Sequence, residues 1–124
     1  MLLNNLYALL SLGFSEQKDA FTATIMLQKD HPVFKGHFPG NPILPGVCTV
    51  QIIRELMEKA TGRELRLSKA GNIKYLGFIN PLTTPEVQLV CTIRESDAGS
   101  VVCSATVLAD GNPLCSFKGE FVGL

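Results

Sequence analysis

The stretch GHFPGNPILPGV (residues 36–47) is the least ordinary part of this sequence, and it decides how the rest is interpreted. Prolines fix φ and hold the residue before them extended, so such a segment has little conformational freedom to lose on folding. We therefore expect a stiff loop that leads into a helix and holds the lone His37 in one place. The residues that set this pattern are Pro39, Pro42 and Pro45 at every third position, with Gly40 after the first proline and Gly46 after the last.

The next stretch, VCTVQIIRELMEKATG (residues 47–62), predicts the one long helix of the chain, ended by Gly62. At 100° per residue its apolar side chains fill a wide face. A face this broad is typical of a helix enclosed by a sheet. The apolar face consists of Val50, Ile52, Ile53, Leu56, Met57 and Ala60, and a narrower polar stripe, solvated by default, consists of Gln51, Arg54, Glu55 and Glu58 with Val47 at its head.

Strand-like segments make up most of the remaining sequence. AFTATIMLQ (20–28) precedes the helix, and further segments follow it at 72–79, 86–95, 100–109 and 114–122. The turn signals NPLTTP, SDAG and DGNP separate the later segments, and the short second and third connections predict an antiparallel meander. The predicted fold class is α+β, with one long helix against an antiparallel sheet in a single domain over residues 1–124.

The first 14 residues, MLLNNLYALLSLGF, are leucine-rich but contain polar interruptions. Leu3, Leu6 and Leu10 have helical spacing, which predicts a short helix that packs on the domain. No basic residue precedes the stretch, and the following SEQKDA is a poor cleavage site, so we expect no signal peptide. No apolar run approaches the roughly 18 residues of a membrane span, and we expect a cytoplasmic protein.

The overall composition constrains the classes of partner. The 11 basic and 11 acidic residues balance, so no long-range attraction to nucleic acid or to an anionic membrane is expected. The hydrophobic content of 46% with 18% charged residues is high for a small soluble monomer. We interpret the excess as a subunit interface or an apolar ligand channel.

The four cysteines, Cys48, Cys91, Cys103 and Cys115, form no Cys-x-x-Cys pair, and the last three alternate with apolar neighbours. This pattern favours buried, reduced thiols. The spacing of Cys48 with the two histidines matches no familiar metal site, so no metal is predicted.

The proline-rich segment also suggests chemistry. It ends at Gly46 and Val47, where the N–H groups of the helix N-terminus are unpaired and carry a partial positive charge. A carbonyl placed there would have developing negative charge stabilised, and a nearby His37 could remove a proton. This layout suits proton abstraction next to a carbonyl. By itself, however, a lone loop histidine is more often structural or solvated.

The segment HPVFKGHFPGNPILPGV (31–47) resembles the signature of the hotdog-fold β-hydroxyacyl-thioester dehydratases of fatty-acid synthesis. That family carries Gly-His-Phe-x-Gly-x-Pro-x-x-Pro-Gly before its central helix, and KYLGFINPL (74–82) is similar to the strand that follows the helix. The resemblance implies a hotdog fold, in which an antiparallel sheet wraps one central helix. The matching residues are Gly36, His37, Phe38, Gly40, Pro42, Pro45 and Gly46.

The resemblance also implies roles for individual residues. His37 would take the α-proton of a 3-hydroxyacyl thioester, and the N–H of Gly46 would polarise the thioester carbonyl. Phe38, Pro45 and Val47 would bind substrate. The substrate would be carried by an acyl carrier protein, without a cofactor or metal. The family assembles as dimers, which implies a homodimer or higher homo-oligomer, or a heterodimer of two hotdog chains.

One position departs from the family pattern. Where the family has an acidic residue that handles the leaving hydroxyl, this chain has Gln51, and Glu55 stands where a glutamine is common. The two positions are one turn apart on the same helix face. Glu55 could act as the acid, His37 could make both proton transfers while Gln51 orients the hydroxyl, or the site could be weakened or inactive.

The leading hypothesis is therefore a 3-hydroxyacyl-thioester dehydratase that forms the trans-2-enoyl thioester. Two alternatives stay open. The chain could be an acyl-binding partner subunit of a hotdog heterodimer. The glutamine at position 51, where the family has an acidic residue, motivates this alternative. It could also be a thioesterase on the same fold, with Glu55 activating water, although the proline-rich segment resembles the dehydratases more closely.

Overall fold

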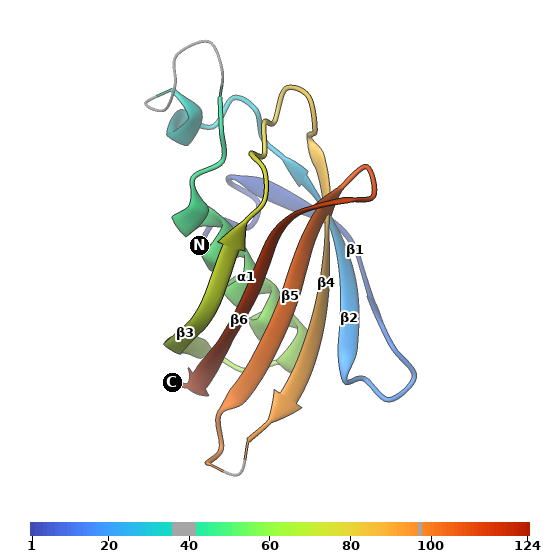
Figure 1. The fold of residues 1–124 in the computed structure, drawn as a ribbon, viewed down its shortest axis with the longest axis vertical. Coiled ribbons are helices and arrows are strands. Elements are labelled where there is room, and N and C mark those ends of the chain that lie inside the picture. The colour runs from blue at the N-terminus through green and yellow to red at the C-terminus, as the bar shows by residue number, and fades with distance from the viewer. Residues whose placement is uncertain (36–41, 97) are drawn as a thin grey trace.

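The protein is a single curved sheet wrapped around one long helix (Figure 1). The computed structural model describes residues 1–35, 42–96 and 98–124, so the predicted site residues His37 and Phe38 lie outside the described residues. Within them the sheet is antiparallel with strand order β1-β2-β4-β5-β6-β3. The elements are β1 (Tyr7–Phe14), β2 (Ala20–Leu27), the short 3₁₀ helix η1 (Pro32–Phe34), α1 (Gly46–Thr61), β3 (Leu65–Tyr75), β4 (Glu86–Glu95), β5 (Val101–Ala109) and β6 (Asn112–Gly123).

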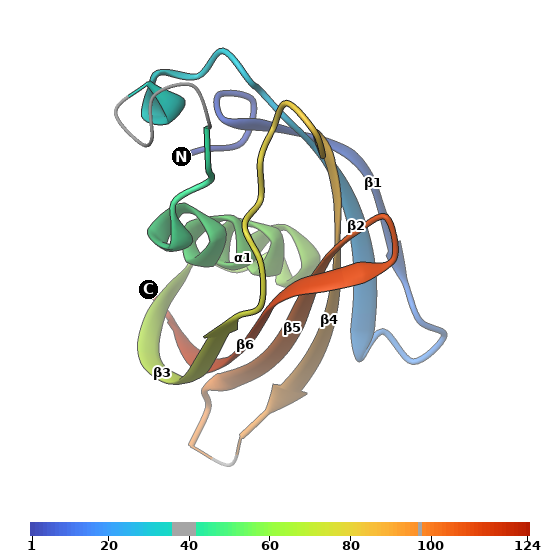
Figure 2. The same cartoon turned by 45° about the horizontal axis from the view of Figure 1, so that its top comes forward.

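The core lies between α1 and the concave face of the sheet (Figure 2). Strand alternation produces it: in β4 the buried side chains of Val87, Leu89 and Cys91 alternate with exposed ones. In α1 the side chains of Ile52 and Ile53 are at most 2% exposed, which confirms the predicted apolar face. This arrangement of one helix inside an antiparallel sheet confirms the predicted hotdog fold.

Helix α1 begins at Gly46 and ends one residue before Gly62, as the sequence predicts to within one position. Gly62 adopts a left-handed conformation with φ 69°, and its N–H donates to the carbonyl of Glu58. A side chain is strained in this conformation. Gly62→Ala should therefore lower the free energy of unfolding by about 1 kcal/mol, measured by urea denaturation. Gly13→Ala is the control, since no atom lies within 4 Å of its added Cβ and its φ is not positive; an equal loss in both variants would contradict the explanation.

The predicted N-terminal helix is wrong, because residues Tyr7–Phe14 form strand β1. This strand pairs with β2 from Tyr7 opposite Leu27 to Phe14 opposite Phe21. A short turn joins the two strands, and the Ser15 N–H donates to the Ala20 carbonyl over 2.9 Å. The leucine spacing fits a helix, but the free edge of β2 offers backbone hydrogen bonds to the whole segment. Pairing with that edge outweighs the local pattern.

Strand β3 also differs from the prediction. It covers Leu65–Tyr75, whereas the sequence predicted a strand over residues 72–79. β6 is long and pairs with β3 from Leu65 opposite Gly123 to Tyr75 opposite Cys115, so the partner sets the extent of β3. β3 forms an edge of the sheet and is mostly exposed, and Lys69 and Gly71 interrupt the apolar alternation that begins with Leu65 and Leu67. The predicted strands at 20–28, 86–95, 100–109 and 114–122 correspond to β2, β4, β5 and β6.

All four cysteines are free thiols, and Cys91, Cys103 and Cys115 are buried as predicted, whereas Cys48 is only half-buried. A hydrogen bond with Cys103, together with burial, raises the pKa of Cys91, so this thiol stays protonated. Among the described residues, no group of histidine, cysteine and acidic side chains could hold a metal ion. The same part of the chain contains no helix long and apolar enough to cross a bilayer.

Candidate functional site

A cavity of about 370 Å³ opens at the N-terminal end of α1. Its lining is mainly apolar, which suits an acyl chain. One wall comes from residues 43–46 and Thr49, and the other from Tyr75, residues 77–79, Leu114 and Cys115. The cavity therefore lies between the end of the proline-rich segment and the C-terminal end of β3.

The first turn of α1 forms the polar part of this wall. Pro45 precedes the helix in an extended conformation and provides no side-chain cap. Its carbonyl accepts the N–H groups of Cys48 and Thr49 at 3.0 and 3.2 Å. In the described residues the N–H groups of Gly46 and Val47 meet no hydrogen-bond acceptor. They carry the partial positive charge of the helix N-terminus and can bind an oxygen with negative character.

Glycine at position 46 is explained by a close approach of Tyr75. A Cβ added to Gly46 would lie 2.5 Å from the Tyr75 hydroxyl oxygen and 2.7 Å from Cζ. Any side chain at position 46 would therefore displace the Tyr75 ring. The predicted binding residue Pro45 lines the cavity. Val47 does not line it and is 77% exposed, so its role in substrate binding stays a prediction.

Gln51 and Glu55 form one hydrogen-bonded cluster on another side of α1, outside the lining of the cavity. Gln51 Nε2 donates to Glu55 Oε2 at 2.7 Å, and Gln51 Oε1 accepts from Arg54 Nε at 3.3 Å. Glu55 Oε2 also accepts the Leu2 N–H at 2.8 Å. Glu55 Oε1 accepts the Leu3 N–H at 2.8 Å and the Tyr7 hydroxyl at 3.2 Å.

Glu55 is therefore a buried acceptor that holds the N-terminal segment on the helix. Its side chain belongs to the predicted polar stripe, yet the residue is only 4% exposed. Burial would raise the pKa of Glu55, but the hydrogen bonds from Leu2, Gln51, Leu3 and Tyr7 outweigh burial and lower it. Burial and the Glu55 charge raise the pKa of Tyr7. The carboxylate is thus ionised at neutral pH, and the phenol that donates to it keeps its proton.

The rest of the polar stripe is also more than a solvated surface. Arg54 Nη1 lies 3.1 Å from Glu58 Oε1 and donates to the Leu65 carbonyl at 3.1 Å. Glu58 Oε2 accepts the Leu65 N–H at 2.8 Å. These contacts attach α1 to the start of β3. Through Arg54 they connect to Gln51, so both polar atoms of the Gln51 side chain have a partner.

Sequence reasoning missed two features of this region. Tyr75 enters the cavity wall through the pairing of β3 with β6, and no local motif indicates that position. Glu55 anchors the N-terminal segment through the backbone N–H groups of Leu2 and Leu3. Contacts to backbone groups do not depend on residue type, so they cannot be recognised from the sequence.

Comparison with known proteins identifies the family. The family model described as ApeI-like, ApeI dehydratase, matches residues 14–112. A 3-hydroxyacyl-[acyl-carrier-protein] dehydratase FabZ of Oenococcus oeni is 29% identical over 90 residues, which cover 67% of this chain and 63% of that protein. The FabZ of Klebsiella pneumoniae is 31% identical over 97 residues, covering 69% of this chain and 62% of that protein. The matches thus span less than two thirds of these relatives.

Solved structures agree in fold. The dehydratase heterocomplex ApeI:P from Xenorhabdus doucetiae superimposes with a TM-score of 0.68 at 15% identity, covering 93% of this chain and 96% of that one. A protein from Erwinia carotovora gives 0.70 at 24% identity, with 96% and 98% covered. A mutant thioesterase from Pseudomonas aeruginosa gives 0.60 at 18% identity, with 90% and 79% covered. Since the matching family model covers most of its length, this chain belongs to the ApeI-like dehydratase family.

Proposed function

We propose that the protein is a 3-hydroxyacyl-thioester dehydratase that acts on acyl groups carried by an acyl carrier protein. The observation that carries this proposal is the apolar cavity that ends at the uncapped first turn of α1. Membership of a dehydratase family and the FabZ relatives support the reaction type. An acyl chain would lie along the apolar walls, with its thioester carbonyl at the Gly46 N–H.

The proposed reaction is a β-elimination of water. His37 removes the α-proton, and negative charge develops on the carbonyl oxygen, where the Gly46 N–H and the helix N-terminus stabilise it. The C–O bond to the β-hydroxyl then breaks and the α,β double bond forms. The leaving hydroxyl takes a proton and departs as water, so the step is redox-neutral.

The residue that protonates the leaving hydroxyl is not given by the family pattern, because position 51 is a glutamine and not an acid. The contacts of Glu55 argue against Glu55 as the acid, and we therefore propose His37 for both proton transfers. The Glu55 carboxylate accepts four hydrogen bonds and has a lowered pKa, so it holds no proton to donate at neutral pH. Gln51 lies outside the lining of the cavity, so its second amide N–H could orient the departing hydroxyl only at the cavity of a partner chain.

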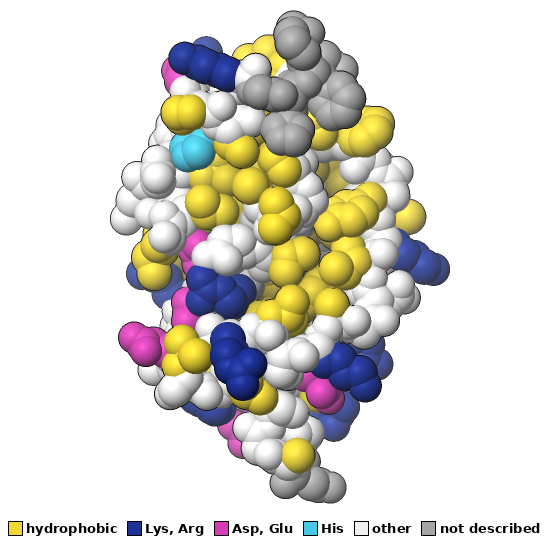
Figure 3. Space-filling view, turned by 90° about the vertical axis from the view of Figure 1, so that its left-hand side faces the viewer, with side chains coloured by type: hydrophobic (Ala, Val, Ile, Leu, Met, Phe, Trp, Pro, Cys, Tyr) yellow, Lys and Arg dark blue, Asp and Glu magenta, His cyan; other side chains and the backbone are white. Residues whose placement is uncertain are grey.

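We further propose that the protein acts as a homodimer whose β3 edges join. β3 is a free edge of the sheet in the described chain. Apolar side chains gather on the face that carries α1 and β3 (Figure 3). Pairing of two edges would bury this surface and satisfy the backbone groups of β3. Exposed apolar residues next to Gly46 at the start of α1 and beyond the end of β3 are Val47, Leu76 and Phe78.

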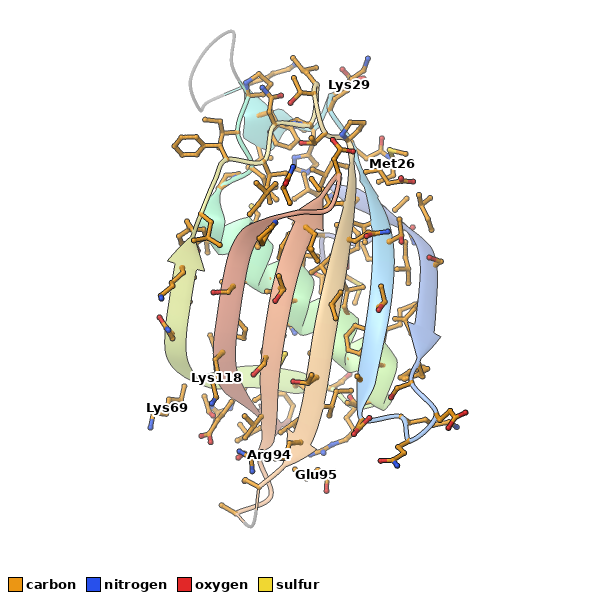
Figure 4. All side chains as sticks on the ribbon, turned by 45° about the vertical axis from the view of Figure 1, so that its right-hand side comes forward. Met26, Lys29, Lys69, Arg94, Glu95 and Lys118 are labelled. Atoms are coloured by element: carbon orange, nitrogen blue, oxygen red, sulfur yellow. The ribbon has the colours of Figure 1, made fainter. Side chains whose placement is uncertain are left out.

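A docking surface for an acidic carrier protein would need basic residues near the cavity. Figure 4 shows Lys69, Arg94 and Lys118 at one end of the sheet, far from Met26 and Lys29 at the other end. Lys74, which precedes Tyr75 in β3 and is exposed, lies next to the cavity wall. We therefore propose Lys74 as a contact for the carrier protein.

A second candidate function follows from the Gln51–Glu55 cluster. With Glu55 engaged by the N-terminal segment, the chain has no free carboxyl at the acidic position of the family. A partner hotdog chain could supply that group across a dimer interface. One structural neighbour is a dehydratase heterocomplex, which makes such an assembly a reasonable alternative to the homodimer.

The test is to incubate the purified protein with a 3-hydroxyacyl carrier-protein thioester and to identify the product by mass spectrometry. A trans-2-enoyl thioester, with a loss of 18 mass units, is the expected product. Free acid would identify a thioesterase instead. Turnover only after addition of a hotdog paralogue with a glutamate at the acidic position would favour the heterodimer. No turnover in either case would overturn the proposal.

Gln51→Glu tests whether a carboxyl at position 51 can protonate the leaving hydroxyl. The new carboxylate would lie beside that of Glu55, since Gln51 Nε2 is 2.7 Å from Glu55 Oε2. Like charges at this distance raise the pKa of one carboxyl, while Arg54 offsets part of the repulsion. We expect a loss of about 1 to 2 kcal/mol in unfolding free energy at pH 7, relative to wild type.

The sign of the pH dependence follows from that raised pKa. A group with a pKa higher in the folded than in the unfolded state costs stability as pH rises through it, so the loss should disappear towards low pH. If position 51 faces the cavity of a partner chain, a carboxyl that stays protonated near neutral pH can act as the acid there, and kcat should rise. Gln51→Met, which has no charge, is the control; it removes only the hydrogen bond from Gln51 to Glu55 and should show a smaller pH-dependent loss than Gln51→Glu. An unchanged kcat in Gln51→Glu would contradict a role for position 51 in the proton transfer.

A further inference from the structure

The Tyr75 side chain stands at the mouth of the cavity, beside the first residue of α1. Its ring and hydroxyl approach Gly46 so closely that a Cβ there would lie 2.5 Å from the hydroxyl oxygen and 3.1 Å from Cε1. Both Tyr75 and Gly46 line the cavity. The phenolic hydroxyl and the Gly46 N–H therefore occupy the same part of its wall.

The Tyr75 hydroxyl is available as a donor. Across the described residues it makes no hydrogen bond, and the residue is 55% exposed. In contrast, the Tyr7 hydroxyl, which is in the core, donates to Glu55. Partial burial, with the nearby Cys115, raises the pKa of Tyr75, so its hydroxyl keeps its proton at neutral pH. A phenol that is neutral and unpaired at the end of an apolar cavity can bind an oxygen of the ligand.

Two fixed donors on one wall match what a developing enolate oxygen requires. One backbone N–H satisfies one lone pair of the oxygen, and a second donor increases the stabilisation of charge in the transition state. Position 75 reaches this place only because β3 runs to the level of Cys115 in β6. Position 46 must be glycine for the ring to lie there.

We propose that the Tyr75 hydroxyl is a second hydrogen-bond donor to the thioester carbonyl oxygen, next to the Gly46 N–H. This inference rests on the proposed dehydratase function. The tyrosine donates a hydrogen bond and transfers no proton, so the proton balance of the elimination is unchanged. Tyr75 is a catalytic residue in the proposed reaction, because its hydroxyl contacts the reacting carbonyl.

Tyr75→Phe is the matched test, since it keeps the ring beside Gly46 and removes only the hydroxyl. We expect kcat for dehydration to fall about 10- to 100-fold, with KM changed less than about 3-fold and the melting temperature unchanged. Thr92→Val removes an exposed hydroxyl from β4 on the outer face of the sheet, and should leave both kinetic constants unchanged.

The controls separate this proposal from the function on which it rests. Absence of dehydration by wild type would refute the proposed function, whereas an active wild type with an unchanged kcat in Tyr75→Phe would overturn only the role of Tyr75. The oligomeric state of both proteins is measured by light scattering. A fall in kcat that accompanies dissociation of the oligomer would show an interface role and would also overturn the proposal.

Gly46→Ala provides a second, independent variant. Its Cβ would displace the Tyr75 ring while the hydroxyl remains in the protein. We expect a loss of kcat in Gly46→Ala at least as large as in Tyr75→Phe, and less than additive loss in the double variant because both remove the same contact. Full additivity would mean that the two positions act separately and would contradict a shared oxygen.

Discussion

Glu55→Gln should lower the free energy of unfolding by about 3 kcal/mol, measured by urea denaturation at pH 7. The Glu55 carboxylate is 4% exposed and accepts hydrogen bonds from the N–H groups of Leu2 and Leu3, the Tyr7 hydroxyl and Gln51. A glutamine has one acceptor oxygen, and its amide group would face at least one donor. A buried donor is then left without an acceptor, which costs more than the net value of a hydrogen bond.

The loss should depend on pH in a defined direction. The pKa of Glu55 is lowered in the folded protein, so its carboxylate contributes stability above the unfolded value of about 4.3. That contribution is lost as pH falls through the lower folded value. The difference between wild type and Glu55→Gln should therefore be constant from about pH 6 upwards and narrow below about pH 4.

Glu64→Gln is the control for this experiment, because Glu64 is exposed and its side chain makes no ion pair or hydrogen bond among the described residues. It should change stability by less than about 0.5 kcal/mol. If Glu55→Gln were as stable as wild type yet inactive, Glu55 would be the general acid, and our choice between the mechanisms would be reversed.

The elements that could be predicted from sequence are those whose signals are local. β4 was predicted over residues 86–95 and has these bounds, because its apolar and polar side chains alternate and turn residues flank it. α1 was predicted to within one residue, because Gly62 supplies a left-handed end and the preceding proline cannot extend the helix. Here the chain neighbours of each residue contain the information that determines its structure.

The two edge strands show the opposite case. β1 has leucines at helical spacing and β3 begins with LRLSKAG, a mixture of polar and apolar residues with a glycine, yet both pair from end to end with a neighbouring strand. Their conformation depends on partners that are distant in the sequence. Each has a face or an edge in solvent, so selection for apolar alternation is weak and the local pattern is misleading.

The candidate site likewise combines residues that local sequence indicates with residues that depend on distant contacts. Gly46 and Pro45 could be assigned from the proline-rich motif, because the motif itself leads into the helix. The partners of Glu55 and the position of Tyr75 depend on contacts across the fold, between residues 2–7 and α1 and between β3 and α1. The exchange of Gln and Glu on one helix face could be seen in the sequence, but its meaning required the contacts.

His37→Ala should lower kcat/KM for dehydration by about 10²- to 10⁴-fold, the range for loss of a general base. His37 lies outside the described residues, and the prediction rests on its place in the proline-rich motif. In the proposed mechanism this imidazole makes both proton transfers, since Glu55 is engaged and Gln51 is an amide. No other described side chain at the cavity can replace it: the lining residues are apolar apart from Thr49, Tyr75 and Cys115.

The matched control is His31→Asn. The Nδ1 atom of His31 accepts the Val33 N–H at 3.0 Å and caps η1, a role that an asparagine side chain can also fill. This variant removes the other histidine of the chain and should keep wild-type kcat/KM. Both variants should melt within a few degrees of wild type. Turnover by His37→Ala at the wild-type rate, under conditions where wild type forms the enoyl thioester, would remove the base from the mechanism, and the helix N-terminus would then act without it.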